Sequence, residues 1–230
     1  MNIGFRMITQ IRRPQPDELA VLHGLRSCDI SDVLNRAGTM TGLRAAYPDV
    51  RPVIGPAVTV SIPIGGINMI KLGMQQTRPG DILVVSVQGD STTAMWGGNL
   101  SRGLKARGVA ALVIDGAIRD VSEIREAEFP VFCRGIATAA GPIETSAGEI
   151  NVPIACGGVV VNPGDIVVAD EDGIVVVPPA AAPDVAAATR RLMEQHANAQ
   201  PVLLRGEVTK IAEITDTFLA AGMSVVEDTP

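Results

Sequence analysis

The sequence predicts an α/β domain in which helices and strands alternate unevenly. Short runs rich in Val and Ile indicate buried strands, and segments with apolar residues at helical spacing lie between several of them. Between residues 131 and 178, however, several strands follow one another with no helix between them. Because a regular doubly wound sheet alternates strand and helix throughout, we expect a different mixed α/β fold.

The chain begins with an arm and two helices. Residues 1–13 show no clear period and indicate an extension. Pro16, followed by two acidic residues, predicts the start of a helix. Its apolar face is expected to hold Leu19, Leu22 and Leu25. A second short helix is predicted from Ser31, with Gly38 as its end.

A strand and a helix follow. The continuous apolar run of residues 52–62 predicts a strand buried on both faces. After a glycine turn, residues 67–77 predict a helix that ends before Pro79. The Pro-Gly-Asp turn at residues 79–81 precedes a β-branched strand, and the turn at residues 163–165 precedes another. Because their flanking residues do not repeat, we interpret them as independent turns.

The stretch from Trp96 to Asp120 predicts a loop, a helix, a buried strand and a second loop. The first loop opens with Gly97 and Gly98. An amphipathic helix and the apolar strand 109–114 follow, and the second loop is expected over residues 116–120.

Short strands dominate the next part, around residues 131–132, 150–154 and 159–161. The acidic turn of residues 170–173 precedes a strand at residues 174–177. Its consecutive carboxylates could bind a cation, but consecutive side chains alternate in direction, so we interpret the turn as a solvated hairpin tip.

The C-terminal part is predicted to be helical. Ala-rich residues 180–200 indicate one long helix, and residues 203–219 indicate one or two more. We expect a single domain over residues 1–230, with a core at about 17–180 and a helical extension at about 181–222.

Composition excludes several classes of protein. A chain of 230 residues with 47% hydrophobic content can bury a full core, and 3% aromatic content requires an aliphatic one. The net charge of -6 argues against a nucleic-acid surface. Because no apolar run could span a bilayer or form a signal core, we expect a cytoplasmic protein without nucleic-acid or membrane partners.

The cysteines and histidines form no recognisable site. Cys28, Cys133 and Cys156 lack zinc spacing and are expected to be small buried hydrophobic residues. Neither His23 nor His196 has a neighbouring His or Cys at ligand spacing, so nothing local supports a Cys–His nucleophile.

The two loops around the 109–114 strand carry the candidate ligand-binding residues. Glycines at a helix start let an anion approach unpaired backbone amides. Arg119 can bind a carboxylate, and Asp120 offers a hard oxygen to a metal. Lying side by side, the loops would form a site for a metal and an oxo-acid. The alternative is an ordinary helix start and a surface pair in which Asp120 is a helix cap.

The sequence of residues 80–135 resembles one protein family. The motifs that carry the resemblance are Gly80-Asp81-Ile82-Leu83-Val84-Val85, Trp96-Gly97-Gly98-Asn99-Leu100, Lys105-Ala106-Arg107-Gly108-Val109, Asp115-Gly116-Ala117-Ile118-Arg119-Asp120-Val121 and Phe129-Pro130-Val131-Phe132. The family holds the metal-dependent 4-hydroxy-4-methyl-2-oxoglutarate and 4-carboxy-4-hydroxy-2-oxoadipate aldolases, and the ribonuclease E activity regulator A (RraA). The similarity extends roughly from Leu22 to Pro178 and is densest at the two loops.

The resemblance implies a fold and an assembly. It implies an RraA-like swivelling β/β/α domain with peripheral helices, assembled as a homotrimer or as a hexamer formed by a dimer of trimers.

The resemblance also implies a class II, divalent-metal-dependent lyase. The reaction would be retro-aldol cleavage of a 4-hydroxy-2-oxo acid to pyruvate, oxaloacetate decarboxylation, or both, through a metal-stabilised enolate. The family's pattern assigns the metal, Mg²⁺ or Mn²⁺, to Asp120, partly through water. It assigns the substrate oxygens to Arg119. The backbone amides that would hold the small 2-oxo acid belong to Gly97, Gly98, Asn99 and Leu100.

Two positions depart from the family's pattern. Its active aldolases usually carry Asp or Glu where this chain has Asn99, and an amide cannot accept a proton from metal-bound water. A Glu that a neighbouring subunit contributes aligns near Glu194 or His196, in a part of weak similarity. Asn99 remains a candidate catalytic residue, with aldolase activity lost or altered.

Three classes of function remain open. The first is the metal-dependent lyase, and the second is a non-catalytic, protein-binding regulator of a ribonuclease. The third is a Schiff-base aldolase, which would need Lys71, Lys105 or Lys210 desolvated in a pocket.

Overall fold

The computed structural model describes residues 3–63, 65–141 and 147–226. Contacts divide the chain into two compact units, Met1–Thr189 and Arg190–Pro230. The first unit contains the sheet and the expected core. Helix α6 begins in the first unit and continues into the second, which also contains α7.

The strands are short except in the middle of the sheet. They are β1 (Phe5–Met7), β2 (Arg44–Ala45), β3 (Val53–Ser61), β4 (Ile82–Ser86), β5 (Ala94–Trp96), β6 (Ala111–Ile118), β7 (Val131–Ile136), β8 (Gly148–Ile150), β9 (Ile154–Cys156), β10 (Val159–Val161), β11 (Ile166–Ala169) and β12 (Ile174–Val177).

The helices lie between the central strands and at both ends of the chain. They are α1 (Pro16–Ala20), α2 (Ser27–Val33), α3 (Ile67–Gln76), α4 (Gly98–Ala106), α5 (Val121–Glu126), the 3-10 helix η1 (Pro179–Ala181), α6 (Ala182–Leu203) and α7 (Ile211–Ala220). Within the described residues, no helix has the length and apolar character needed to cross a membrane.

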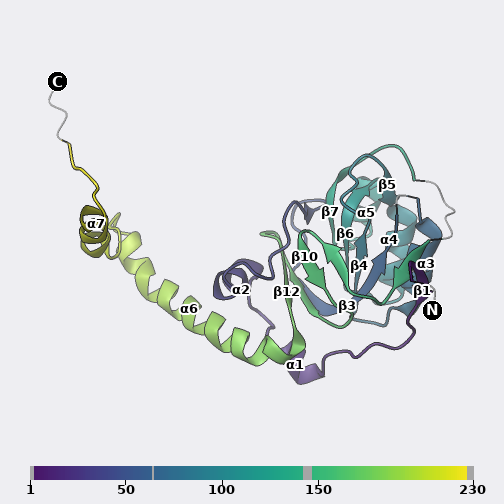
Figure 1. Cartoon of the computed structure of the whole chain (residues 1–230), viewed down its shortest axis with the longest axis horizontal. Helices are drawn as coiled ribbons and strands as arrows, with labels where there is room; N and C mark the ends of the chain where they lie inside the picture. The colour runs from purple at the N-terminus through teal and green to yellow at the C-terminus, as the bar shows by residue number, and fades with distance from the viewer. Residues whose placement is uncertain (1–2, 64, 142–146, 227–230) are drawn as a thin grey trace. The chain divides into compact units, whose positions relative to one another are not determined.

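A parallel group of strands forms the middle of the main sheet. The strand order of the sheet is β1-β8-β3-β4-β6-β7-β2. The parallel group consists of β3, β4, β6 and β7, which are labelled in Figure 1. Strand β5 pairs in parallel with the end of β6, whereas β11 pairs antiparallel with β3 and β12. This topology places the carboxyl ends of β5 and β6 side by side.

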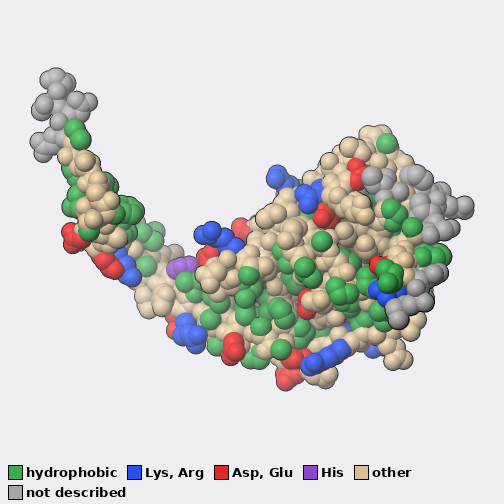
Figure 2. Space-filling view, in the orientation of Figure 1, with side chains coloured by type: hydrophobic (Ala, Val, Ile, Leu, Met, Phe, Trp, Pro, Cys, Tyr) green, Lys and Arg blue, Asp and Glu red, His purple; other side chains and the backbone are tan. Residues whose placement is uncertain are grey.

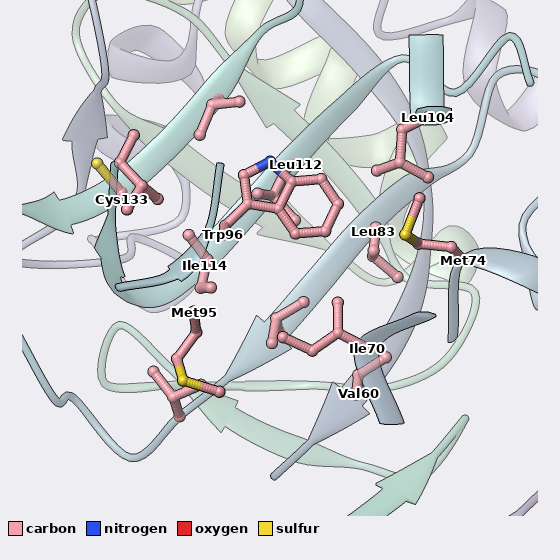
Figure 3. Close-up of a cluster of buried hydrophobic side chains, with 14 of the residues drawn as sticks. Val60, Ile70, Met74, Leu83, Met95, Trp96, Leu104, Leu112, Ile114 and Cys133 are labelled. Carbon is pink, nitrogen blue, oxygen red and sulfur yellow. The ribbon is translucent and has the colours of Figure 1, made fainter. Parts of the chain in front are cut away.

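The central strands are buried on both faces, as the continuous apolar run in β3 predicted. In β4, Leu83 and Val85 contribute to one apolar cluster, whereas Ile82 and Val84 contribute to the other. The first cluster includes side chains from α3, α4 and α5, with Ile70, Met74 and Leu104 among them (Figure 3). The second includes side chains from β9 to β12.

Helices on one face of the central sheet and further strands on the other make a β/β/α arrangement. This confirms the mixed α/β fold class and the architecture that the resemblance implied. The aliphatic core follows from the alternation of side chains along each strand, which gives both faces Val, Ile and Leu.

Near the N-terminus the structure differs from the sequence prediction. Residues 1–13 were expected to form an extension without regular structure, but β1 pairs in parallel with β8. Phe5 and Met7 flank Arg6 in an apolar–polar alternation, but a strand of three residues is too short for such an alternation to be distinguished from chance.

The second helix begins and ends earlier than expected. It begins at Ser27, not Ser31, and ends at Val33, before the predicted end at Gly38. The Ser27 amide donates to Asp170 Oδ2 at 2.7 Å, and the Ser27 hydroxyl donates to Asp170 Oδ1. Asp170 is therefore buried, at 6% exposure, and the prediction of a solvated hairpin tip was wrong for this residue. Contacts between residues this distant in sequence cannot be read from local capping patterns.

The strand before the second loop is longer than expected. Strand β6 runs through residues 116–118, which were predicted to be loop, and pairs there with β5 and β7. All its residues are buried. The second loop therefore consists of Arg119 and Asp120 alone, directly after the strand.

Candidate functional site

The two loops predicted to bind a ligand lie side by side. Strand β5, helix α4 and strand β6 form a βαβ unit in which the strands are parallel. Just beyond their paired ends, the Arg119 amide donates to the Trp96 carbonyl at 3.0 Å. The loop after β5 and the loop after β6 therefore leave the sheet at the same edge, where ligands bind in many open α/β sheets.

Trp96 anchors the first loop to the core. Its indole is buried in the helix-side cluster beside Leu112 and Ile114 (Figure 3). The indole Nε1 donates to Ser101 Oγ at 2.7 Å, and Ser101 Oγ donates to the Gly97 carbonyl at 3.2 Å. These bonds hold the start of α4 in one position.

Gly97 and Gly98 allow the second loop to approach the start of α4. The Gly98 amide, which has no partner within the helix, donates to Asp120 Oδ2 at 3.2 Å. A Cβ atom on Gly97 would lie 2.4 Å from Asp120 Oδ2. On Gly98, a Cβ would lie 2.4 Å from Glu123 Oε2. The glycines thus serve a close approach between two loops.

Asp120 has a backbone conformation that is uncommon for a residue with a side chain. Its φ is +57°, in the left-handed region, and it precedes the first residue of α5. A conventional N-cap residue has extended backbone and caps with its side chain, but Asp120 makes no such bond. Its carboxylate instead faces the first loop, with 36% of the side chain exposed. Asp120 therefore occupies the N-cap position of α5, as the helix-cap alternative expected, but its side chain does not cap the helix.

Arg119 presents its guanidinium beside the same carboxylate. Its Nε lies 3.7 Å from Asp120 Oδ2, and the side chain is 47% exposed. A long contact of this kind contributes little stability and leaves most of the guanidinium donors open to a ligand.

The two loops line one cavity of about 440 Å³ together with α3 and residues 140–141. The Ala94 amide donates to the Ala139 carbonyl, and the Gly141 amide donates to the Ala94 carbonyl, so this wall is tied to β5. The lining residues are Ile67, Lys71, Ala94, Met95, Trp96, Gly97, Asn99, Leu100, Arg119, Asp120, Ala140 and Gly141. Of the candidate residues, only Gly98 is absent from this lining, and its amide binds Asp120.

Asn99 is an exposed residue in the first turn of α4. Its Oδ1 accepts a long bond of 3.3 Å from Arg102 Nη1, which also donates to Glu123 Oε2 at 2.7 Å. The amide therefore lies in the cavity wall, next to a charged pair on its outer side.

Sequence reasoning did not place Lys71 in the site, although it named this residue as a Schiff-base candidate. Ile67 and Lys71, four residues apart on α3, both line the cavity. Helical spacing could have predicted their shared face. That this face meets the cavity depends on how α3 packs against the sheet. Lys105 instead donates to the Ala127 carbonyl at 2.6 Å, and Lys210 belongs to the second unit.

A hard divalent cation would find one carboxylate in the cavity lining. Among the described residues, no group of three or more His, Cys, Asp or Glu side chains could hold a metal. That carboxylate belongs to Asp120, and 36% of its side chain is exposed. Mg²⁺ and Mn²⁺ suit such a site because Mg²⁺ keeps several waters and needs one or two carboxylates. Glu194 and His196 belong to the second unit, described separately.

The cysteines are free, and two are buried as expected. Burial raises the pKa of the Cys133 thiol to about 11 and also raises the pKa of Cys156. Burial likewise raises the pKa of Cys28, which is only half-buried. Because the thiolate is the reactive form, none of these environments favours a nucleophile.

Charges are dispersed on one face of the molecule (Figure 2). On the face shown in Figure 2, Lys and Arg side chains lie in separate small groups among Asp and Glu. The cavity differs, since its charged lining consists of Lys71, Arg119 and Asp120, two cations and one carboxylate.

Comparisons with known proteins agree on one family. The family model described as RraA-like, Aldolase/RraA, matches residues 27–176. A protein of Halalkalibacterium halodurans named "Putative 4-hydroxy-4-methyl-2-oxoglutarate aldolase" is 40% identical over 149 residues, 65% of this chain and 70% of that protein. The Thermus thermophilus protein named 4-hydroxy-4-methyl-2-oxoglutarate aldolase is 35% identical over 113 residues, 48% of this chain and 66% of that protein.

A solved structure shows the same fold. It is a Streptomyces coelicolor protein described as an unusual member of the RNase ES inhibitor RraA protein family. At 30% identity the two structures have a TM-score of 0.73, covering 83% of this chain and 99% of that chain.

Proposed function

Because the chain belongs to the RraA-like (Aldolase/RraA) family, we propose that it is a divalent-metal-dependent carbon–carbon lyase acting on a 2-oxo acid. One observation carries the proposal. The Arg119 guanidinium, the Asp120 carboxylate and the amides at the start of α4 meet at one cavity. The aldolase names of the relatives support the reaction class.

Arg119 and the first loop would bind the substrate carboxylate. A guanidinium offers paired donors that match the two oxygens of a carboxylate. The start of α4 adds backbone amides and the positive end of the helix dipole. The Gly98 amide already donates to Asp120. The amides of Asn99 and Leu100 therefore remain to bind the acid.

Asp120 would hold the metal, which is proposed to be Mg²⁺ or Mn²⁺. When bound, the ion draws electrons from the keto and carboxylate oxygens of the substrate and so stabilises an adjacent carbanion. The Gly98 amide donates to one carboxylate oxygen of Asp120, Oδ2, and the side chain lines the cavity with 36% of its surface exposed. The left-handed backbone at residue 120 is an uncommon conformation of the kind found at ligand-binding sites, and it supports a binding role for Asp120.

Retro-aldol cleavage also requires a proton to move. When the bond between C3 and C4 breaks, the electron pair stays on C3 as the pyruvate enolate. The C4 hydroxyl loses its proton as the second carbonyl forms, and C3 then gains a proton. Asn99 can position the hydroxyl or a water by hydrogen bonding, but it cannot accept the proton.

Oxaloacetate decarboxylation makes a smaller demand on position 99. The same enolate forms when carbon dioxide leaves, and no hydroxyl proton must be removed. Asn99 therefore favours decarboxylation over retro-aldol cleavage in this chain, and we expect the first rate to exceed the second.

The second candidate is a non-catalytic regulator that binds a ribonuclease. The structural neighbour in the RNase ES inhibitor RraA family favours it. Under this alternative the cavity would be retained without turnover. By resemblance, either function is proposed to act in a homotrimer or in a hexamer of two trimers. Sedimentation should then give three or six times the chain mass of 23.9 kDa.

Assays of purified protein separate these candidates. Oxaloacetate decarboxylation and cleavage of 4-hydroxy-4-methyl-2-oxoglutarate would be measured after chelation and after Mg²⁺ or Mn²⁺ is restored. We expect turnover to disappear with chelator and to return with metal. Turnover that persists in chelator would contradict the metal-dependent mechanism. No turnover of any 2-oxo acid, together with tight binding to a ribonuclease, would establish the regulator instead.

A further inference from the structure

We propose that Lys71 is a specificity-determining residue of the cavity. Its ammonium would bind a carboxylate at the end of the substrate opposite the one that Arg119 binds. This inference rests on the proposed function, since it assumes that a 2-oxo acid occupies the cavity.

Lys71 has a fixed place in the cavity wall. Its neighbours on α3, Ile70 and Met74, belong to the buried helix-side cluster (Figure 3). A Cβ atom on Gly73 would lie 2.4 Å from Val60 Cγ2, so this glycine lets α3 pack closely against β3. The backbone of Lys71 is therefore held firmly, while its side chain remains exposed and free to reach a ligand.

The ammonium of Lys71 has donors to spare. It donates to Asn68 Oδ1 at 3.2 Å, and among the described residues it forms no ion pair with a carboxylate. Lys105 differs, because its Nζ lies 3.7 Å from Glu128 Oε2 and donates to a backbone carbonyl. A cation that lines a cavity and has no carboxylate partner within the described residues is available to an anionic ligand.

The two cations of the cavity come from different elements. Lys71 belongs to α3, whereas Arg119 follows β6. The cavity lining also includes the apolar side chains of Ile67, Met95 and Leu100. A ligand with a carboxylate at each end and carbon between them matches this combination of charged and apolar groups.

A carboxylate-binding role also suits the chemistry of a lysine here. A Schiff-base lysine needs a desolvated, deprotonated amine, whereas the side chain of Lys71 is exposed. An ammonium on a flexible stem can follow carboxylates at different distances, unlike the planar fork of an arginine.

Calorimetry with two matched ligands tests the inference. In the presence of Mg²⁺, 2-oxoglutarate and 2-oxopentanoate would be titrated into the full chain; they differ in having a carboxylate or a methyl group at the far end. The variants are Lys71→Met, Lys71→Arg and the control Lys105→Met, each first compared with wild type by thermal unfolding.

We expect wild type to bind 2-oxoglutarate at least about tenfold more tightly, the effect of one charged hydrogen bond. Lys71→Met should lose this preference and keep the affinity for 2-oxopentanoate. Lys71→Arg should keep most of the preference for 2-oxoglutarate, and Lys105→Met should keep all of that preference. In kinetics, Lys71→Met should raise KM for a dicarboxylic substrate with little change in kcat.

Other results would overturn the inference. An unchanged preference in Lys71→Met, or equal wild-type affinity for both ligands, would refute the role of Lys71 and leave the proposed function standing. Binding of neither ligand, with no metal-dependent turnover, would refute the proposed function and this inference together. Borohydride trapping of substrate on Lys71 would show a Schiff base instead.

Discussion

Two regions of this molecule hold an aspartate in opposite ways. At the turn before β4, Asp81 is 1% exposed and accepts bonds from the Arg13 guanidinium at 2.8 and 3.0 Å and from the Arg78 amide at 2.8 Å. At the cavity, Asp120 is 36% exposed and accepts one bond of 3.2 Å, with a long contact to Arg119. Both carboxylate oxygens of Asp81 accept hydrogen bonds from protein donors, whereas the Asp120 carboxylate accepts one.

The difference separates structural carboxylates from ligand-binding ones. A buried carboxylate is tolerated only when protein donors replace its lost water, so its partners become part of the folded state. A half-exposed carboxylate with an incomplete donor set still binds water and can exchange that water for a metal. Mutations at the two positions should therefore affect different measurements.

The largest effect is expected on activity from Asp120→Ala. Loss of the carboxylate should remove metal binding and lower metal-dependent turnover more than about a thousandfold, or about 4 kcal/mol in activation free energy. The unfolding temperature should change little, because Asp120 makes only one weak bond. Kinetics, Mn²⁺ binding by electron paramagnetic resonance and thermal unfolding would be compared. A variant as active as wild type would remove Asp120 from the mechanism.

The reverse pattern is expected from Asp81→Ala. The Arg13 side chain, 18% exposed, would lose its carboxylate partner and keep only its bond to the Gln76 carbonyl among the described contacts, and the free energy of unfolding should fall by about 2–3 kcal/mol. Below the unfolding transition, turnover per folded molecule should stay near that of wild type. Urea unfolding and assays at low temperature measure both quantities. If Asp81→Ala kept full stability and lost activity, the distinction between the two regions would fail.

A smaller effect on activity is expected from Asn99→Asp, which would place a second carboxylate with few hydrogen-bond partners at the cavity. Asn99→Asp supplies a group that can accept the C4 hydroxyl proton, and the retro-aldol rate should rise about tenfold or more. Decarboxylation should change far less, since it requires no such acceptor. The ratio of the two rates is the measurement, and equal changes in both would show that residue 99 has no part in that proton transfer.

The smallest effect concerns the buried interior and pH. Burial raises the pKa of Cys133 to about 11 from an ordinary value of 9.0. The folded state therefore favours the neutral thiol, and this contribution to stability is complete below pH 9 and is lost as pH rises from 9 through 11. Between pH 8 and pH 10, the free energy of unfolding of wild type should fall by about 1 kcal/mol more than that of Cys133→Ala. Urea unfolding at pH 8, 9 and 10 compares them, and parallel stability curves would contradict the expectation.

Much of the fold and the local chemistry of the site could be predicted from the sequence, because their signals are local. The apolar run of β3 and the helical spacing of α3 predicted those elements closely. The loop glycines and the Arg119–Asp120 pair fall within one short stretch, so the resemblance was densest there.

Long-range contacts explain what could not be predicted. The start of α2 depends on Asp170, which is distant in sequence, and the length of β6 depends on pairing with β5 and β7. Lys71 belongs to a separate helix, and only the packing of α3 against the sheet brings it to the cavity. A sequence pattern predicts which face a residue occupies, but not what that face meets.

The βαβ unit from Ala94 to Asp120 has a consequence for protein engineering. Both loops of the cavity are carried by one uninterrupted segment and joined by the bond between Arg119 and Trp96. This segment could be grafted as a single cassette onto a related scaffold, bringing its ligand-binding groups already aligned. Lys71 and Ile67 of α3 and residues 140–141 would remain with the host. Under the proposed function, one cassette placed in several hosts would then combine the same metal- and carboxylate-binding groups with different walls for the rest of the acid.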